Sequence, residues 1–156
     1  MTPFVHQYYA NGLQNNARVF QFLLRDLPEN DPRWDSRPDL ERFSLREVVA
    51  HLLDYDTVSR ERFEHLIREE NPQVPDWDPT DAAAHYATRN PLHQIESLIL
   101  SRRELSDWLM GLSEKEWARR GARSKVGEFS VEDGAAFVLA HDAYHLAQVV
   151  EWLGAI

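Results

Sequence analysis

The last stretch of the chain carries the residues best suited to chemistry, two histidines four positions apart. His141 and His145 lie in an apolar, proline-free run from Ser130 to Ile156. If this run is an α-helix, residues i and i+4 lie one above the other on the same face. Both imidazoles would then point the same way, about one turn apart, where a single metal ion could bind both. The rest of the chain would have to supply a third ligand.

An HxxxH pair on a helix is a moderate signal by itself, and its surroundings narrow the chemistry. The HExxH protease motif is absent, because Asp142 follows His141 and no glutamate separates the two histidines. A ferritin-like di-iron site would need paired Glu-x-x-His motifs on two helices, and these are absent too. Two unpaired imidazoles on a core face would be costly to desolvate, which favours a partner for their lone pairs.

The composition excludes several classes of function. The chain has 156 residues, no cysteine and a formal net charge of −9. Without thiols, disulfides, thiolate zinc sites and cysteine nucleophiles are excluded. Lysine and arginine form no clustered run, so we expect no nucleic-acid partner. Neither a basic leader followed by an apolar run nor an apolar stretch of about 20 residues is visible, so we expect a cytoplasmic protein with no membrane partner.

Hydrophobic periodicity and capping signals predict four long helices. They are expected over Phe4–Leu27, from the capping box at Ser44 to about Glu70, from Asn90-Pro91 to about Leu112, and from Ser130 nearly to the C-terminus. No strand pattern competes with them. The sequence therefore predicts an all-α fold, an antiparallel four-helix bundle, with residues 1–156 as a single domain.

The connecting segments are predicted from their proline, glycine and charge content. Pro28–Leu40 and Asn71–Pro79 each contain three prolines and read as loops. Trp34 in the first loop is expected to fold back over an open end of the core. A short helical piece is expected between Asp78 and Thr88. Gly121–Phe129 has two glycines and no strong periodicity, so it is predicted to be a loop before the last helix.

Polar residues on the apolar helix faces are the next candidates for a site. Asn16 lies in the middle of the first helix's stripe, where it either faces a neighbouring polar group or lines an internal site. His51 lies at the edge of the second helix's stripe, close to Tyr55. Taken alone, a histidine there is more often a packed or hydrogen-bonded residue than a ligand. His85 and His93 are expected to pack or to lie in solvent.

The last helix is apolar on two opposite faces. One face carries the two histidines, and the other carries four apolar residues: Leu139, Ala143, Leu146 and Val150. A helix that is apolar on two sides is buried on two sides. One side should face the bundle core, and the other a neighbouring helix or a second subunit. We therefore expect a homodimer formed through this helix.

Three segments together resemble the DinB/YfiT-like superfamily of four-helix bundles, and the similarity covers essentially the whole chain. They are Asn16-Ala17-Arg18, Val49-Ala50-His51-Leu52 and the eight residues from His141 to Gln148. The resemblance implies that His51, His141 and His145 together hold a divalent cation, commonly zinc or nickel. Three neutral imidazoles leave coordination positions open, as in catalytic sites.

Three further residues are candidates for supporting this site. Gln148, one turn beyond His145, could hydrogen-bond a water on the metal, and Asn16 and Tyr55 could contact the ligands from outside. A purely structural role is the alternative for each of these three residues.

The family resemblance implies a metal-dependent enzyme acting on a small molecule and leaves the reaction open. Members of the superfamily transfer low-molecular-weight thiols, isomerise maleylpyruvate with a thiol, or are named as metal-dependent hydrolases. The cation would activate a thiol cosubstrate or a water. Thiol transfer is favoured because Asp54 and Asp142 lie roughly 60° to 100° around their helices from the nearest ligand, a poor position for a general base. The alternative is a non-catalytic, dimeric bundle that binds a metal or a small ligand.

Overall fold

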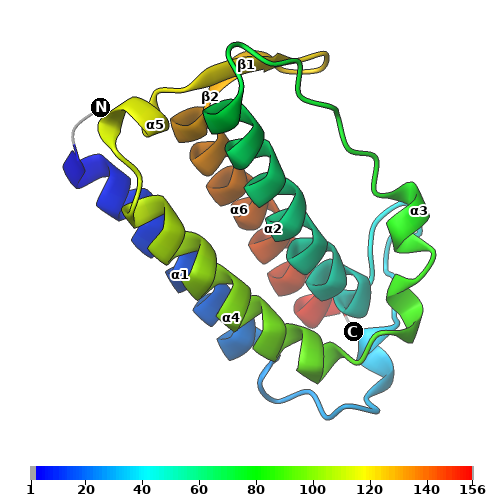
Figure 1. Ribbon diagram of the computed structural model, residues 1–156. Helices are drawn as coiled ribbons and strands as arrows, with labels where there is room; N and C mark the ends of the chain where they lie inside the picture. The colour runs from blue at the N-terminus through cyan, green and yellow to red at the C-terminus, as the bar shows by residue number, and fades with distance from the viewer. Residues whose placement is uncertain (1–2, 156) are drawn as a thin grey trace.

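Four long helices build the protein, and a computed structural model describes them within residues 3–155 (Figure 1). They are α1 (Pro3–Leu24), α2 (Leu45–Arg68), α4 (Pro91–Met110) and α6 (Val131–Ala155). Shorter elements connect them: η1 (Pro32–Trp34), α3 (Thr80–Ala83), η2 (Tyr86–Thr88), α5 (Glu114–Trp117), β1 (Arg120–Arg123) and β2 (Gly127–Ser130). The expected four-helix bundle is confirmed. Within the described residues, none of the helices is long and apolar enough to cross a membrane.

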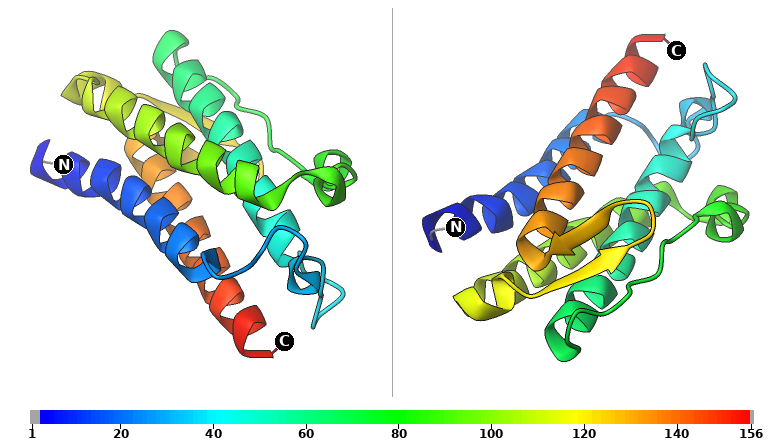
Figure 2. Two further views of the ribbon diagram at one scale, coloured as in Figure 1. Left: turned by 90° about the horizontal axis from the view of Figure 1, so that it is seen from below. Right: turned by 90° about the horizontal axis from the view of Figure 1, so that it is seen from above.

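The order of the helices around the bundle differs from their order in the chain. Both α1 and α2 pack against α4 and α6, so the first two helices lie diagonally opposite each other. The crossover segment 69–90 returns the chain along the outside of the bundle, so that α2 and α4 run in the same direction (Figures 1 and 2). The antiparallel neighbours are therefore α1 with α4 and α2 with α6, and it is the second pair that carries the three histidines.

Two reciprocal capping boxes fix where the histidine-bearing helices begin. Ser44 Oγ accepts from the Glu47 amide at 3.2 Å, and the Glu47 carboxylate accepts from the Ser44 amide at 3.1 Å. Before α6, Ser130 Oγ accepts from the Asp133 amide at 3.0 Å, and Asp133 accepts from the Ser130 amide at 2.8 Å. Both predicted helix starts are confirmed. Because each start is fixed, so is the helical position of every ligand candidate that follows it.

A β-hairpin occupies the segment predicted to be a loop, so that prediction was wrong, as was the expected absence of strands. β1 and β2 pair antiparallel, with Gly121 opposite Phe129. The strands have four residues each, too few to produce a recognisable alternation. The crossover segment supports β1, since the Val74 amide donates to the Ala122 carbonyl at 2.8 Å. Gly121 allows this close approach, because a Cβ there would lie 2.6 Å from the Pro72 carbonyl oxygen.

The apolar core has two clusters, one toward each end of the bundle. Trp34 is fully buried in one of them, and its Nε1 donates to the Pro28 carbonyl at 2.8 Å. The expectation that this tryptophan folds back over the core is confirmed. Between the two clusters lies a layer of buried charge formed by Asp56, Arg102 and Asp142, each at most 2% exposed.

Candidate metal centre

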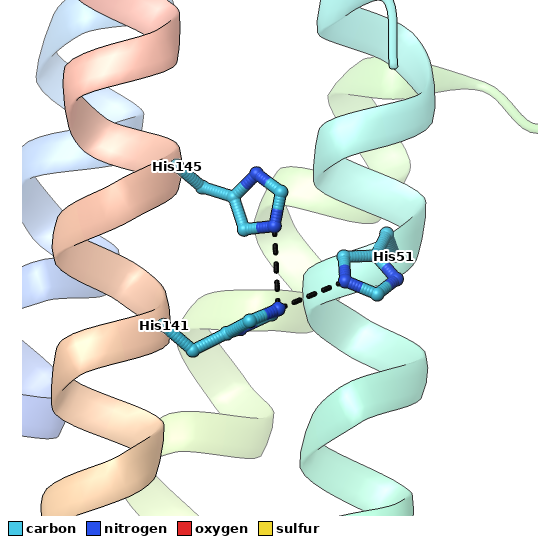
Figure 3. Close-up of side chains that lie close together, drawn as sticks. All are labelled: His51, His141 and His145. Atoms are coloured by element: carbon cyan, nitrogen blue, oxygen red, sulfur yellow. Dashed lines mark hydrogen bonds between the residues drawn. The ribbon is translucent and has the colours of Figure 1, made fainter. Parts of the chain in front are cut away.

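Three histidines from α2 and α6 converge on one point in the bundle (Figure 3). His51 Nε2 lies 2.9 Å from His141 Nε2, which lies 3.2 Å from His145 Nε2. Metal–imidazole bonds of about 2.0–2.1 Å, at ligand angles between about 90° and 109°, place two nitrogens of one ion roughly 2.8–3.4 Å apart. The structure thus brings together all three predicted ligands at distances that fit one shared ion.

A chain of hydrogen bonds fixes the tautomer of His145. The Gln148 side-chain nitrogen donates to the Phe43 carbonyl at 2.8 Å, which turns the amide oxygen toward His145. That oxygen lies 2.9 Å from His145 Nδ1, so Nδ1 must carry the proton and donate it. The lone pair is then on Nε2, the atom that faces the other two histidines. Gln148 therefore contacts the ring of a ligand candidate from behind, a different contact from the metal-bound water considered above.

Aromatic rings hold the other two histidines. Tyr55 stacks on His141, with ring centroids 4.0 Å apart and an interplanar angle of 24°. Trp77 stacks on His51 at 5.6 Å and 7°. The Nδ1 atoms of His51 and His141 are buried and have no hydrogen-bond partner among the described residues. Stacking therefore orients these two rings, and it assigns Tyr55 a direct contact with a ligand candidate.

Burial keeps the histidine cluster uncharged. It lowers the pKa of His51 to about 3, with the nearby His145 as a further cause. Burial likewise lowers the pKa of His141 to about 2, assisted by His145 and His51. The pKa of His145 is also lowered, again by burial first. All three imidazoles are neutral near pH 7, which is the state in which a nitrogen can bind a metal.

The other polar candidates do not contact the three histidines. Asn16 Nδ2 donates to the Asp142 carboxylate at 3.1 Å, which confirms the reading in which it faces a neighbouring polar group. Asp142 is fully buried and accepts from Arg102 Nη2 at 2.7 Å. Asp54 accepts two hydrogen bonds from Arg89, at 2.9 and 3.2 Å. Both aspartates are thus engaged in ion pairs, in agreement with their expected unsuitability as general bases.

A cavity of 210 Å³ opens beside the cluster. His51, His145 and Gln148 line it together with residues that the sequence analysis missed: Glu41, Arg42, Phe43, Pro79 and Tyr144. Arg42 forms an ion pair with Glu151 at 3.0 Å and lies 4.5 Å from the centroid of the Trp152 ring. Most of the missed residues come from loops without periodicity, so no pattern in the sequence marks them.

The fold and the site define the protein as a four-helix bundle with a buried three-histidine cluster. The sequence model of the DinB superfamily matches residues 13–149, so the chain belongs to this superfamily. A protein of Oceanobacillus iheyensis named "putative metal-dependent hydrolase" is 25% identical over 151 residues, covering 96% of this chain and 86% of its own.

A solved structure shares the fold over nearly the whole chain. YfiT from Bacillus subtilis superimposes with a TM-score of 0.87 at 17% sequence identity, covering 97% of this chain and 87% of its own. It is described as "a probable metal-dependent hydrolase with an unusual four-helix bundle topology". The diagonal placement of α1 and α2 seen here is consistent with that description of the topology.

Proposed function

We propose that this protein is a metal-dependent enzyme that acts on a small molecule, with one divalent cation held by His51, His141 and His145. The convergence of three neutral Nε2 atoms is the observation that carries the proposal. Zinc and nickel are the metals that we propose, since imidazole suits both. A cation there would supply Lewis acidity, lowering the pKa of a water or thiol that it binds.

The remaining residues of the site position these ligands and the substrate. Gln148 holds His145 in the tautomer with a free Nε2, and Tyr55 and Trp77 hold the other two rings. Three protein ligands leave coordination positions for other molecules. The adjoining cavity gives a small molecule access to His51 and His145.

Two reactions remain as alternatives, thiol transfer and hydrolysis. Thiol transfer to a small electrophile, with a low-molecular-weight thiol as cosubstrate, is favoured because the nearby Asp54 and Asp142 are held in ion pairs. A thiol bound to a cation needs no separate carboxylate base. Hydrolysis is the second candidate, because Glu41 lines the same cavity and because the two relatives described above carry that name.

Activity measurements on the metal-loaded protein separate these alternatives. We expect turnover with a thiol plus an electrophile, or with esters and amides, and we expect His145→Ala to reduce it by at least a hundredfold with the helical content unchanged. His93→Ala, which changes an exposed histidine, is the matched control. Glu41→Gln should impair hydrolysis and leave thiol transfer intact. Absence of turnover in both assays, with metal bound, would support the non-catalytic bundle and contradict the proposal.

A homodimer formed through α6 is part of the proposal. Of the four apolar residues predicted on the second face of this helix, Leu139 and Leu146 pack against the core clusters, which corrects that part of the expectation. The other two, Ala143 and Val150, are exposed, Val150 by 56%. Exposed apolar side chains can mark a protein interface, and a two-fold interface uses the same patch on both subunits. Light scattering is expected to give about twice the chain mass of 18.2 kDa, and Val150→Glu should shift the protein toward the monomer. Leu40→Glu, at another exposed apolar position, is the control. A wild-type monomer at micromolar concentration would refute the dimer.

A further inference from the structure

A second cavity, larger than the one at the histidine cluster, lies between α2 and the crossover segment. Its volume is 350 Å³. Its walls are shared between the two segments: the helix contributes Val58, Glu61, Arg62, His65 and Arg68, and the crossover contributes Val74, Pro75, Asp76 and Trp77. None of these residues belongs to the proposed ligand set, so the cavity requires its own explanation.

Arg62 is the unusual residue of this cavity. Its side chain is nearly buried, since the residue is only 7% exposed, and its Nε makes no hydrogen bond with the described residues. No carboxylate among these residues forms an ion pair with Arg62, whereas Arg123 nearby pairs with Asp76 at 3.2 Å. Arg102, which is similarly buried, is neutralised by two aspartates. Asp76 attracts Arg62 from the same cavity without pairing with it, so the buried Nε still lacks an acceptor, which a ligand oxygen could supply.

The pKa of Arg62 agrees with this geometry. Burial lowers it from its ordinary value and the positive charge of Arg123 lowers it further, while Tyr55 and Asp76 oppose the shift in part. An arginine remains charged in proteins despite such a shift. Its planar guanidinium is suited to bind a carboxylate or a phosphate through two parallel hydrogen bonds.

The remaining walls are suited to the apolar part of a ligand. Val58 and Val74 provide aliphatic surface, and Trp77 provides an indole ring. The other charges of the lining are paired or exposed: Arg68 pairs with Glu69, Asp76 pairs with Arg123, and Glu61 is exposed. Apolar walls with a positioned polar group are typical of small-molecule sites. The combination fits an organic anion: an apolar or aromatic body that carries one carboxylate or phosphate.

Trp77 connects this cavity to the histidine cluster. The ring that lines the cavity also stacks on His51. Arg62 follows His51 by eleven residues on α2, about 16 Å along the helix axis. Side chains on a helix lean toward its N-terminus, so the Arg62 side chain extends back toward the histidines. An elongated molecule anchored at Arg62 could therefore extend toward the cluster.

We propose that this cavity binds an organic anion, with Arg62 binding its carboxylate or phosphate and Trp77 packing against its apolar body. We assign this anion as the substrate or cosubstrate of the histidine site, a role that rests on the proposed function. Binding itself is independent of the reaction and can be measured without it.

Calorimetric titration of the folded protein tests the site with three probes of similar shape: benzoate, phenyl phosphate and neutral benzamide. The two anions are expected to bind and benzamide is not, and the stronger of the two anions identifies the preferred group. Arg62→Gln should weaken anion binding at least tenfold. Arg60→Gln removes the same charge from the same helix outside this cavity, where Arg60 pairs with Glu64, and should leave binding unchanged. In the wild-type protein, the Nε–H resonance of Arg62 should shift on adding either anion.

Equal binding of benzamide and the anions, or wild-type anion affinity in Arg62→Gln, would contradict the proposed anion site. If Arg62→Gln does not fold, an Arg62 resonance that is insensitive to both anions overturns it as well. If the anions bind the metal-free protein but no assay detects turnover, the proposed anion site stands and the proposed enzymatic function is refuted. If the anions do not bind and turnover is unchanged in Arg62→Gln, the proposed anion site is refuted and the proposed enzymatic function stands.

Discussion

Replacing Arg102 with methionine is expected to lower the free energy of unfolding by about 3–5 kcal/mol, because it removes one partner of a buried ion network. Arg102 Nε donates to Asp56 at 2.6 Å, and Nη2 donates to Asp142 at 2.7 Å. Burial opposes the positive charge, but the two carboxylates outweigh it and raise the pKa of Arg102. Methionine fills a similar volume and leaves two buried carboxylates without their cation. Urea unfolding of the metal-free protein measures the effect.

Arg103→Met is the matched control, since it removes the same charge at the adjacent, exposed position. It should change the free energy of unfolding by less than about 0.5 kcal/mol. A triple variant, in which Asp56→Leu and Asp142→Leu are added to Arg102→Met, separates the effect of charge from that of packing. It should recover much of the lost stability, since apolar replacements of buried ion triads are often neutral or stabilising. A loss below about 1 kcal/mol in Arg102→Met would show that the network is hydrated and contributes little.

The same network connects the bundle to its histidine cluster. Asn16, Asp56, Arg102 and Asp142 lie on α1, α2, α4 and α6, so the hydrogen bonds of one arginine and one amide join all four helices. Asp142 directly follows His141 in the chain. Fixing this residue at the centre of the bundle fixes the rotation of α6 about its axis. The network therefore supports the convergence of the three imidazoles without touching any of them.

Local signals were sufficient to predict the helices, because their start residues carry their own hydrogen-bond partners. Ser44 and Ser130 each cap a helix through a residue three positions later, which a sequence reveals directly. The hairpin at β1 and β2 was not predictable in this way. Its strands are four residues long, and its support comes from the distant crossover residues Pro72 and Val74. Pairing between distant segments leaves no periodic pattern in either one.

In the candidate site, too, residues with a local sequence signal were predictable and residues that depend on tertiary contacts were not. The pair His141 and His145 is visible from its spacing, whereas His51 was assigned through the family resemblance. The partners of Asn16 and Asp142 were not foreseeable, because Arg102 looks like one of two adjacent surface arginines until the helices are packed. Trp77 stacks on His51 from a segment whose course depends on the crossover. Residues that act through tertiary contacts alone carry no local signature.

Metal affinity is expected to be almost independent of pH between 7 and 5.5. An ordinary histidine, with a pKa near 6.5, is mostly protonated at pH 5.5, and each such ligand weakens metal binding by about tenfold. Burial lowers the pKa of His51 to about 3 and that of His141 to about 2. A lowered pKa means that the neutral, metal-binding form persists below pH 6.5, so protons do not compete. We expect a change of less than about threefold, where two ordinary histidines would give about a hundredfold.

Equilibrium dialysis of the untagged protein against zinc or nickel, followed by elemental analysis, measures this affinity at both pH values. One ion per chain is expected, and His51→Ala should reduce the affinity by at least a hundredfold, because two imidazoles of one helix turn remain. His85→Ala changes an exposed histidine and is the control. A hundredfold loss of wild-type affinity at pH 5.5 would mean that the imidazoles are protonated before the metal binds. The cluster would then be open to water in the metal-free protein, and burial could not be what keeps its nitrogens available.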